Sequence, residues 1–179
     1  MHPSATVIGT DLSPIQPGFV PPNVKFEVDD CCDEWLYRNP FDFVHLRGMY
    51  GSIADWHQLY TQALQHLRPG GYIEQVEASA VVRSDDGSVE NTKMKELGVL
   101  GEQATAKLGK SLSVVDEMKD GMIKAGFIDV TERSFKIPIG PWPKDQGLKT
   151  LGRYNRLMFE ESLEMWSMML FTRVLGVSV

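Results

Sequence analysis

The chain has 179 residues, of which 42% are hydrophobic and 23% charged, a composition typical of one soluble globular domain and not of disordered or collagen-like chains. Its formal charge is −6, from 18 basic and 24 acidic side chains, so charge alone predicts no binding to nucleic-acid backbones or anionic lipid. No apolar run approaches the roughly 18 residues of a membrane-spanning helix. We therefore expect no direct contact with nucleic acid or membrane.

The two cysteines, Cys31 and Cys32, are neighbours in the sequence. Neighbouring cysteines are poorly placed for a stapling disulfide, which favours a reducing intracellular compartment, either cytoplasmic or nuclear. No further Cys or His stands at ligand spacing from this pair, so we expect no metal site. The first five residues lack a charged region followed by a long apolar one, which predicts no secretory signal.

Short apolar segments predict β-strands along much of the chain. The first covers residues 5–9 and the second Val24–Val28. The third, residues 41–46, has little polar alternation, which predicts burial on both faces of a parallel sheet. A fourth is predicted from 72 to about 82, and a fifth over 127–139, where prolines end it.

Helical periodicity separates and follows these strands. Residues 53–67 carry apolar side chains at helical spacing, between a capping signal at Ser52 and Asp55 and the breaker sequence Pro69-Gly70-Gly71. Further helices are predicted at 91–108, 113–126 and 148–175. Strands that alternate with helices predict the α/β class, with one open parallel sheet joined by right-handed crossovers and covered by helices.

Ligands of open parallel sheets bind beyond the carboxyl ends of the strands. Asp11 follows the first strand, and a carboxylate can accept both hydroxyls of a ribose. Asp29 and Asp30 follow the second strand, where a carboxylate can accept the amine of adenine. Residues 45–50 follow the third strand and 74–77 the fourth, and together these ends predict a nucleoside-sized pocket.

Each of these residues also has a purely structural interpretation. An aspartate after a strand commonly caps a turn, and Asp29 with Asp30 can form a solvated loop. His45 lies in an apolar strand, where a hydrogen-bonded core histidine is commoner than a catalytic base. Arg47 can pair with a neighbouring carboxylate. The methionines and aromatic residues of the last helix fit core packing better than a substrate cage.

The order of four segments resembles the class I S-adenosylmethionine-dependent methyltransferases, and within them the fungal LaeA-like group associated with secondary metabolism. The segments are 7–14 (VIGTDLSP), 20–26 (VPPNVKF), 41–47 (FDFVHLR) and 67–72 (LRPGGY). Residues 139–144 (IGPWPK) and 152–155 (GRYN) strengthen the resemblance, which covers nearly the whole chain. It implies a Rossmann-like methyltransferase domain over residues 1–179, with a helical cap at about 145–176.

The resemblance also implies roles for individual residues. Asp11 matches the acidic residue that holds the ribose of S-adenosylmethionine, and Leu12 would pack beside the adenine. Asp30, or Asp29, matches the residue near the adenine amine, with Cys31 beside the ring. The segment from His45 through Arg47 to Gly48 matches the one that runs under the sulfonium and lines the acceptor opening. His45 is the candidate catalytic base.

The sequence departs from the family pattern at both ends. The family's first strand, with its glycine-rich cofactor turn, has no counterpart before Asp11, and the final strand is not found before Val179. In the family's sheet order the first strand is central and the final strand lies between the fifth and the sixth. Both losses would leave strand edges unpaired. The resemblance thus implies a truncated methyltransferase sheet.

Three functions follow from these observations. The first is methyl transfer from S-adenosylmethionine to a small-molecule or protein acceptor. The second is a catalytically degenerate methyltransferase-like protein that acts as an interaction partner in a regulatory complex, through strand edges that accept a partner's strand. The third is a fragment from an incomplete gene model. A nicotinamide-dependent dehydrogenase also places an acidic residue after its second strand, but residues 67–71 favour methyl transfer.

Overall fold

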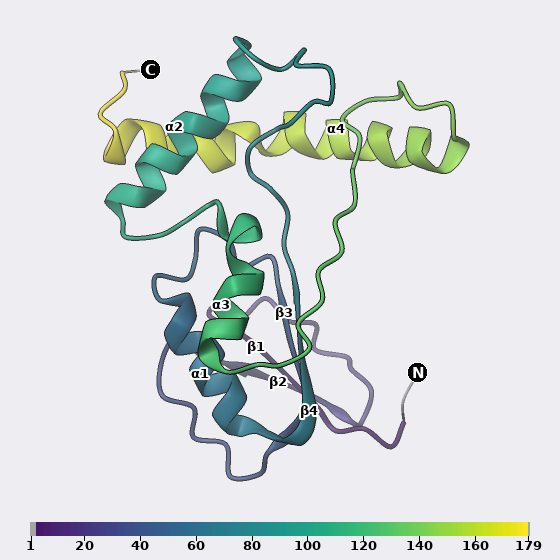
Figure 1. Cartoon of the computed structure of the whole chain (residues 1–179), viewed down its shortest axis with the longest axis vertical. Helices are drawn as coiled ribbons and strands as arrows, with labels where there is room; N and C mark the ends of the chain where they lie inside the picture. The colour runs from purple at the N-terminus through teal and green to yellow at the C-terminus, as the bar shows by residue number, and fades with distance from the viewer. Residues whose placement is uncertain (1–2, 179) are drawn as a thin grey trace.

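The computed structural model of the chain describes residues 3–178 and is of the mixed α/β type (Figure 1). Four strands lie in its first half: β1 Val7–Asp11, β2 Val24–Val28, β3 Phe41–Arg47 and β4 Leu67–Val76. The helices are α1 Trp56–His66, α2 Lys93–Lys107, the 3-10 turn η1 Val114–Asp116, α3 Met118–Ala125, α4 Gln146–Met168 and the π-helical η2 Met169–Val174.

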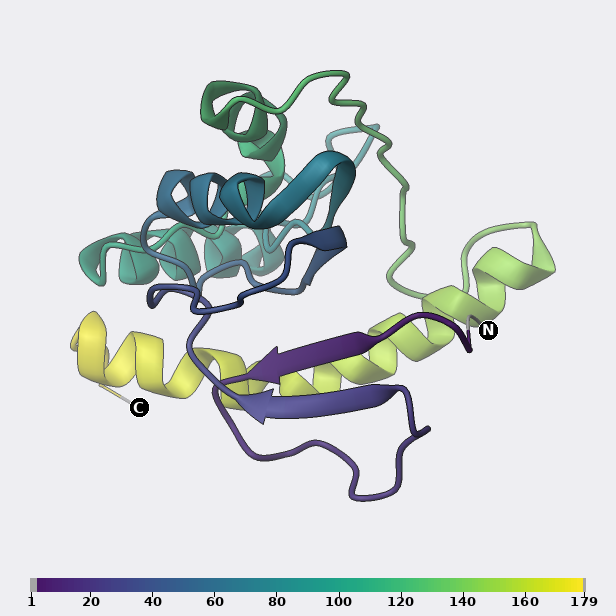
Figure 2. The ribbon, with the colours of Figure 1, turned by 90° about the horizontal axis from the view of Figure 1, so that it is seen from below.

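The strands form two separate parallel pairs, so the single continuous sheet predicted from the sequence is not formed within residues 3–178. β1 pairs with β2, and β3 pairs with β4. Figure 2 shows β1 and β2 side by side and separate from β3 and β4. Each strand therefore has one edge without a β-partner in the described residues. The parallel α/β class is confirmed, but as two small sheets.

The predicted fifth strand is also wrong. Residues 127–139 have no regular secondary structure, and Ile128 and Phe135 are largely exposed. A strand needs a neighbouring strand whose backbone N–H and C=O groups bond to its own. Residues 127–139 are paired with no strand in the described part of the chain. β4 ends at Val76, before the predicted limit of 82, because Val76 pairs with Arg47, the last residue of β3.

Only one face of β3 is covered. Val44 and Leu46 are buried, whereas Phe43, His45 and Arg47 are exposed. The prediction of burial on both faces was therefore wrong, since the apolar side chain of Phe43 lies on the exposed face. This alternation assigns His45 to the face opposite the core.

The hydrophobic core lies between β3–β4 and two helices that pack side by side, α1 and α3 (Figure 1). Of the two residues of the predicted capping signal, Asp55 and not Ser52 caps α1: its Oδ1 accepts the N–H of Gln58 at 2.8 Å, so the helix begins at Trp56, after the predicted start at residue 53. Gly126 ends α3 with φ +110°, a conformation that favours glycine. The buried core residues are Val44, Leu46, Ile53, Leu59, Tyr60, Ala63 and Met122.

The second half of the chain adds a layer formed by α2, α4 and η2. The C-terminal segment η2 packs against α2, and α4 extends past both (Figure 1). The expected helix over 148–175 is confirmed in position, with a change from α- to π-helix at Met169. Within residues 3–178, no helix has both the length and the apolar character needed to cross a membrane.

Candidate functional site

Asp11 and Asp29 meet at the carboxyl ends of β1 and β2. The backbone N–H of Asp29 donates to the carbonyl oxygen of Asp11 at 3.2 Å. The side chain of Asp11 is exposed, and its Oδ1 accepts the N–H of Ser13 at 2.8 Å. Leu12, the predicted adenine neighbour, is 70% exposed. The turn-capping interpretation of Asp11 is therefore confirmed, and Oδ2 of this carboxylate has no hydrogen-bond partner among the described residues.

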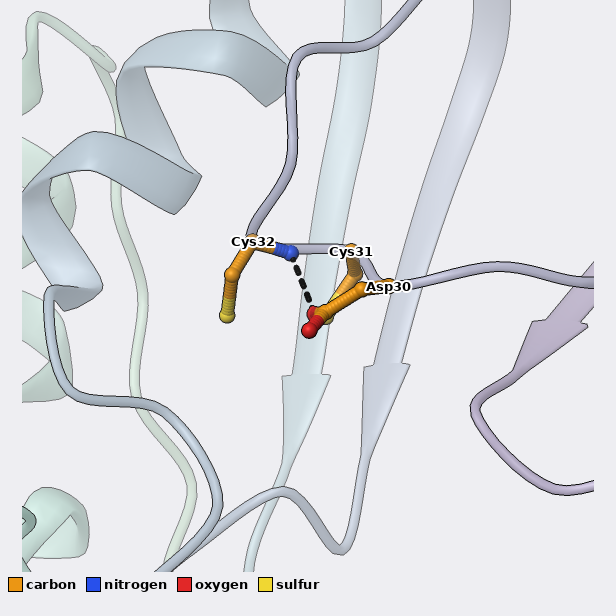
Figure 3. Close-up of side chains that lie close together, drawn as sticks. All are labelled: Asp30, Cys31 and Cys32. Atoms are coloured by element: carbon orange, nitrogen blue, oxygen red, sulfur yellow. Dashed lines mark hydrogen bonds between the residues drawn. The ribbon is translucent and has the colours of Figure 1, made fainter.

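Asp30, Cys31 and Cys32 follow β2 and point to the same side of one short segment (Figure 3). Oδ1 of Asp30 accepts the N–H of Cys32 at 2.9 Å. Both thiols are free. Burial, followed by the neighbouring Cys32 thiol, raises the pKa of Cys31 to about 12. Burial and the Asp30 carboxylate also raise the pKa of Cys32.

The backbone of the cysteine pair is tied to its surroundings by two side chains. Trp35 donates from Nε1 to the carbonyl of Cys31 at 3.0 Å. Gln58 of α1 donates from Nε2 to the carbonyl of Cys32 at 3.3 Å. Both cysteines also pack against the hydrophobic core. The loop after β2 is thus held on α1.

His45 lies inside β3, two residues before its end, as the predicted range of the third strand implied. Nδ1 of His45 is 2.9 Å from Oε2 of Glu74 on the adjacent strand β4. The side chains are 42% and 57% exposed. His45 is therefore not a buried core residue. It forms a solvent-exposed pair with a carboxylate, an arrangement that can orient an imidazole for proton transfer.

Arg47 and Gly48 lie at the carboxyl end of β3. Arg47 is exposed and forms no ion pair within residues 3–178. The N–H of Gly48 donates to the carbonyl of Val76 at 3.1 Å. Gly48 has φ +65°, and a Cβ placed on it would meet no atom within 4 Å. This end of the strand borders open space.

Glu77 organises the loop after β3, a role that the sequence did not reveal. Its Oε1 accepts the N–H of Met49 at 3.0 Å, and its Oε2 accepts the N–H of Tyr50 at 3.2 Å. Gln75 donates from Nε2 to Oε1 of Glu77 at 3.3 Å. The only signal in the sequence was the position of Glu77 just after the fourth strand. One carboxylate thus fixes two successive amides of a loop predicted to line the cofactor.

The loops after β2 and β3 pack on the same core. Cys31 and Cys32 from the first loop and Met49 from the second all contact it. Two cavities lie elsewhere, around α2 and α4. The larger, of about 370 Å³, is lined by Met94, Ile139, Gly140, Pro141, Trp142, Arg156, Phe159 and Glu160. The predicted cofactor-site residues thus lie at strand ends and in the loops that follow, and they line neither of these cavities.

A family model described as a methyltransferase domain matches residues 2–121. This stretch includes all four strands and both loops described above. The chain belongs to the methyltransferase-domain family. The predicted family is therefore confirmed, while the contribution of each site residue stays a prediction.

Curated fungal proteins are similar to nearly the whole chain. The chain is 43% identical over 177 residues to methyltransferase pytC of Aspergillus terreus, covering 98% of this chain and 55% of the relative. It is 34% identical over 178 residues to secondary metabolism regulator laeA of Aspergillus fumigatus, covering 98% of this chain and 48% of the relative. A third relative, protein-methionine methyltransferase laeA of Emericella nidulans, is 34% identical over 177 residues, covering 97% of this chain and 47% of the relative.

The chain thus spans about half the length of the curated relatives it matches. Its predicted similarity to the LaeA-like group is confirmed by these names. No solved structure matches the chain.

Proposed function

We propose that this methyltransferase transfers a methyl group from S-adenosylmethionine to a small-molecule or protein acceptor in fungal secondary metabolism. The observation that carries the proposal is the meeting of Asp11 with Asp29 at the carboxyl ends of β1 and β2. In α/β folds this is the edge where nucleoside-containing ligands bind. The name of the Aspergillus fumigatus relative supports the secondary-metabolism context, and that of the Emericella nidulans relative names protein methionine as the group methylated.

The residues at this edge fit the chemistry of a nucleoside cofactor. Asp11 keeps one carboxylate oxygen free among the described residues, which suits a ribose hydroxyl donor. Leu12 offers an exposed apolar surface to an adenine ring, and Asp30 a half-buried carboxylate to its amine. Gly48 leaves open space above the end of β3.

The chemistry that the cofactor supplies is a methyl group already activated by its sulfonium. The protein then has mainly to align donor and acceptor, about 3–3.5 Å apart. We assign Glu77 the task of holding the Met49 and Tyr50 amides, and thereby the loop beside the acceptor. His45, oriented by Glu74, is placed to take a proton from an oxygen or nitrogen acceptor.

Asp11→Asn is the sharpest test of this proposal. The amide oxygen can still accept the N–H of Ser13, so the turn is preserved while the carboxylate is lost. Calorimetric titration with S-adenosylmethionine and S-adenosylhomocysteine is expected to show binding to the unchanged protein and at least tenfold weaker binding to Asp11→Asn. Asp85→Asn, which removes an exposed carboxylate paired with Lys136, is the matched control and should bind normally.

Absence of binding to the folded, unchanged protein would overturn the proposal for this chain. Equal affinity of Asp11→Asn and the control would overturn the ribose assignment alone. The acceptor class is tested by following labelled methyl groups from S-adenosylmethionine into the protein and organic-soluble fractions of a fungal extract.

The free strand edges favour a second candidate, a regulatory role without catalysis. β1, β2, β3 and β4 each have one edge without a β-partner in the described residues, and such edges can accept an extended segment of another protein. Under this proposal a partner's strand adds to the sheet. Recovery of the chain only as a free monomer in pull-down experiments would argue against it.

A further inference from the structure

The Asp30–Cys31–Cys32 cluster brings three potential metal ligands together. One carboxylate oxygen of Asp30 and the Sγ atoms of Cys31 and Cys32 all lie within 4.8 Å of one another. The sequence predicted no metal site because no third Cys or His is near the cysteine pair. A carboxylate oxygen can also bind a metal ion, and Asp30 supplies one beside the two cysteines.

The spacing of the three atoms is close to that of a tetrahedral metal site. With metal–sulfur bonds of about 2.3 Å and metal–oxygen bonds of about 2.0–2.2 Å, ligand atoms of such a site lie roughly 3.3–3.8 Å apart. The separations therefore exceed those of a bound site by at most about 1 Å, a difference on the scale of side-chain rotation.

The cluster is also organised by its surroundings. The carbonyl of Cys31 is held by Trp35 and that of Cys32 by Gln58, and the N–H of Cys32 is bound by Oδ1 of Asp30. These bonds fix the backbone from which both thiols project. A site whose ligands are already positioned loses less conformational freedom when the ion binds.

The charges around the cluster permit a cation to bind. Asp30 forms no ion pair with a basic side chain within residues 3–178. Lys110 is near enough to influence Cys32, but it is not paired with this carboxylate. Asp30, Cys31 and Cys32 are all half-buried, so an ion can reach them from solvent.

We propose that Asp30, Cys31 and Cys32 bind one thiophilic divalent cation of the zinc group, Zn²⁺ or Cd²⁺. Two metal–sulfur bonds and one metal–oxygen bond form, and the two thiol protons pass to solvent. Water fills the fourth position. Two thiolates select against Mg²⁺ and Ca²⁺, which prefer oxygen ligands. The proposal does not depend on methyl transfer.

Titration of the reduced chain with Cd²⁺ tests the site directly. Cadmium bound to thiolates gives an ultraviolet charge-transfer absorption, which we expect to saturate at one ion per chain. Zn²⁺ should compete for the same site, and Mg²⁺ should not. Because the cation binds the folded chain, Zn²⁺ should also raise the Tm.

Three variants remove one ligand each: Cys31→Ser, Cys32→Ser and Asp30→Asn. Each should weaken Cd²⁺ binding at least tenfold, and the two serine variants should also lower the absorption. Asn at position 30 can still accept the N–H of Cys32, so this variant preserves the turn. Asp33→Asn is the matched control, because Asp33 is exposed and lies outside the cluster. It should bind normally.

Several results would overturn the proposal. Saturation at one ion per two chains would mean that cysteines of different molecules share the ion. Equal affinity of Asp30→Asn and Asp33→Asn would remove the carboxylate from the site. Absence of the absorption in the folded, reduced chain would exclude the site altogether. S-adenosylmethionine binding is measured separately, so failure of the proposed function is distinguishable from failure of the metal site.

Discussion

The hydroxyl of Tyr60 donates to Oε1 of Gln75 across 2.6 Å, joining α1 to β4 at the edge of the core. Tyr60 is 1% exposed. Gln75 in turn donates to Glu77, which holds the amides of Met49 and Tyr50. A continuous hydrogen-bond chain therefore runs from the buried helix to the loop after β3. Substitutions in the core can be transmitted to the candidate cofactor site.

Tyr60→Phe removes the hydroxyl but keeps the buried ring. Loss of a hydrogen bond of this kind lowers the free energy of unfolding by about 0.5–1.5 kcal/mol. We expect a lower midpoint in urea denaturation with an unchanged slope. Gln75→Leu should give a loss of similar size, and the double variant should lose less than the sum of the two single losses. Strict additivity would show that Tyr60 and Gln75 are not coupled.

Tyr60 also makes the free energy of unfolding depend on pH in alkaline solution. Burial, with a further contribution from the Glu77 carboxylate, raises the pKa of Tyr60 above its ordinary value of 10.0, while the bond to Gln75 opposes this rise. The folded state therefore keeps a proton that the unfolded state loses as pH rises through about 10. This contribution to stability is complete below pH 10 and declines above it.

The comparison of the unchanged protein with Tyr60→Phe isolates this effect from other titrating groups. Urea unfolding between pH 8 and 11 should show the unchanged protein losing its stability advantage over the variant above pH 10. A constant difference across that range would mean that Tyr60 has an ordinary pKa in the folded state.

Glu77→Gln tests the loop after β3. Glutamine has one acceptor oxygen, so it cannot bind the amides of both Met49 and Tyr50 in the way that the carboxylate does. Hydrogen bonds to charged groups contribute about 1.5–3 kcal/mol to stability, and we expect the free energy of unfolding of Glu77→Gln to fall by an amount in this range. Affinity for S-adenosylmethionine should fall roughly tenfold, equivalent to about 1.4 kcal/mol.

Glu74→Gln is the matched control for this substitution. Glu74 is exposed and pairs with His45, and exposed ion pairs contribute about 0–1 kcal/mol. Its unfolding free energy should change little. If Glu74→Gln and Glu77→Gln destabilise the protein equally, Glu77 does not have the organising role that its hydrogen bonds indicate.

Local sequence signals predicted the helices better than the sheet. The range predicted for α1 was 53–67, and the helix spans Trp56–His66 between its Asp55 cap and the following Pro-Gly-Gly. Those signals act within a few residues of the chain. The pairing of strands depends on which strands are available as neighbours, and the pattern at 127–139 carries no such information. That segment therefore resembled a strand but has no strand partner in the described chain.

The candidate site was predictable at its strand ends but not in its side-chain network. Turn chemistry predicted Asp11 and Asp29 just after the first two strands. Asp11 is the last residue of β1 and Asp29 follows β2, and the register of the two strands brings them together. The pairs His45–Glu74 and Glu77–Met49 join residues 28 or 29 positions apart. Such pairs follow from the register of β3 with β4, which the sequence does not specify.

Gly121 tests the packing of α3 against α1. A Cβ added at Gly121 would lie 2.8 Å from Cε2 of Tyr60, whose ring is fully buried. Alanine favours a helix over glycine by about 1 kcal/mol, but overpacking a core costs about 1–3 kcal/mol. Because the ring is held by Gln75 and by the core, we expect the steric cost to exceed the helical gain. Gly121→Ala should therefore lower the Tm and the free energy of unfolding.

Gly18→Ala is the control for the same chemical change, because a Cβ at Gly18 meets no atom within 4 Å. Its effect should stay within about 0.5 kcal/mol, as for surface substitutions generally. Thermal and urea denaturation of both variants compare the two sites. A Gly121→Ala protein more stable than the unchanged chain would contradict the close approach of α1 and α3. It would also remove the steric reason for glycine in the middle of α3.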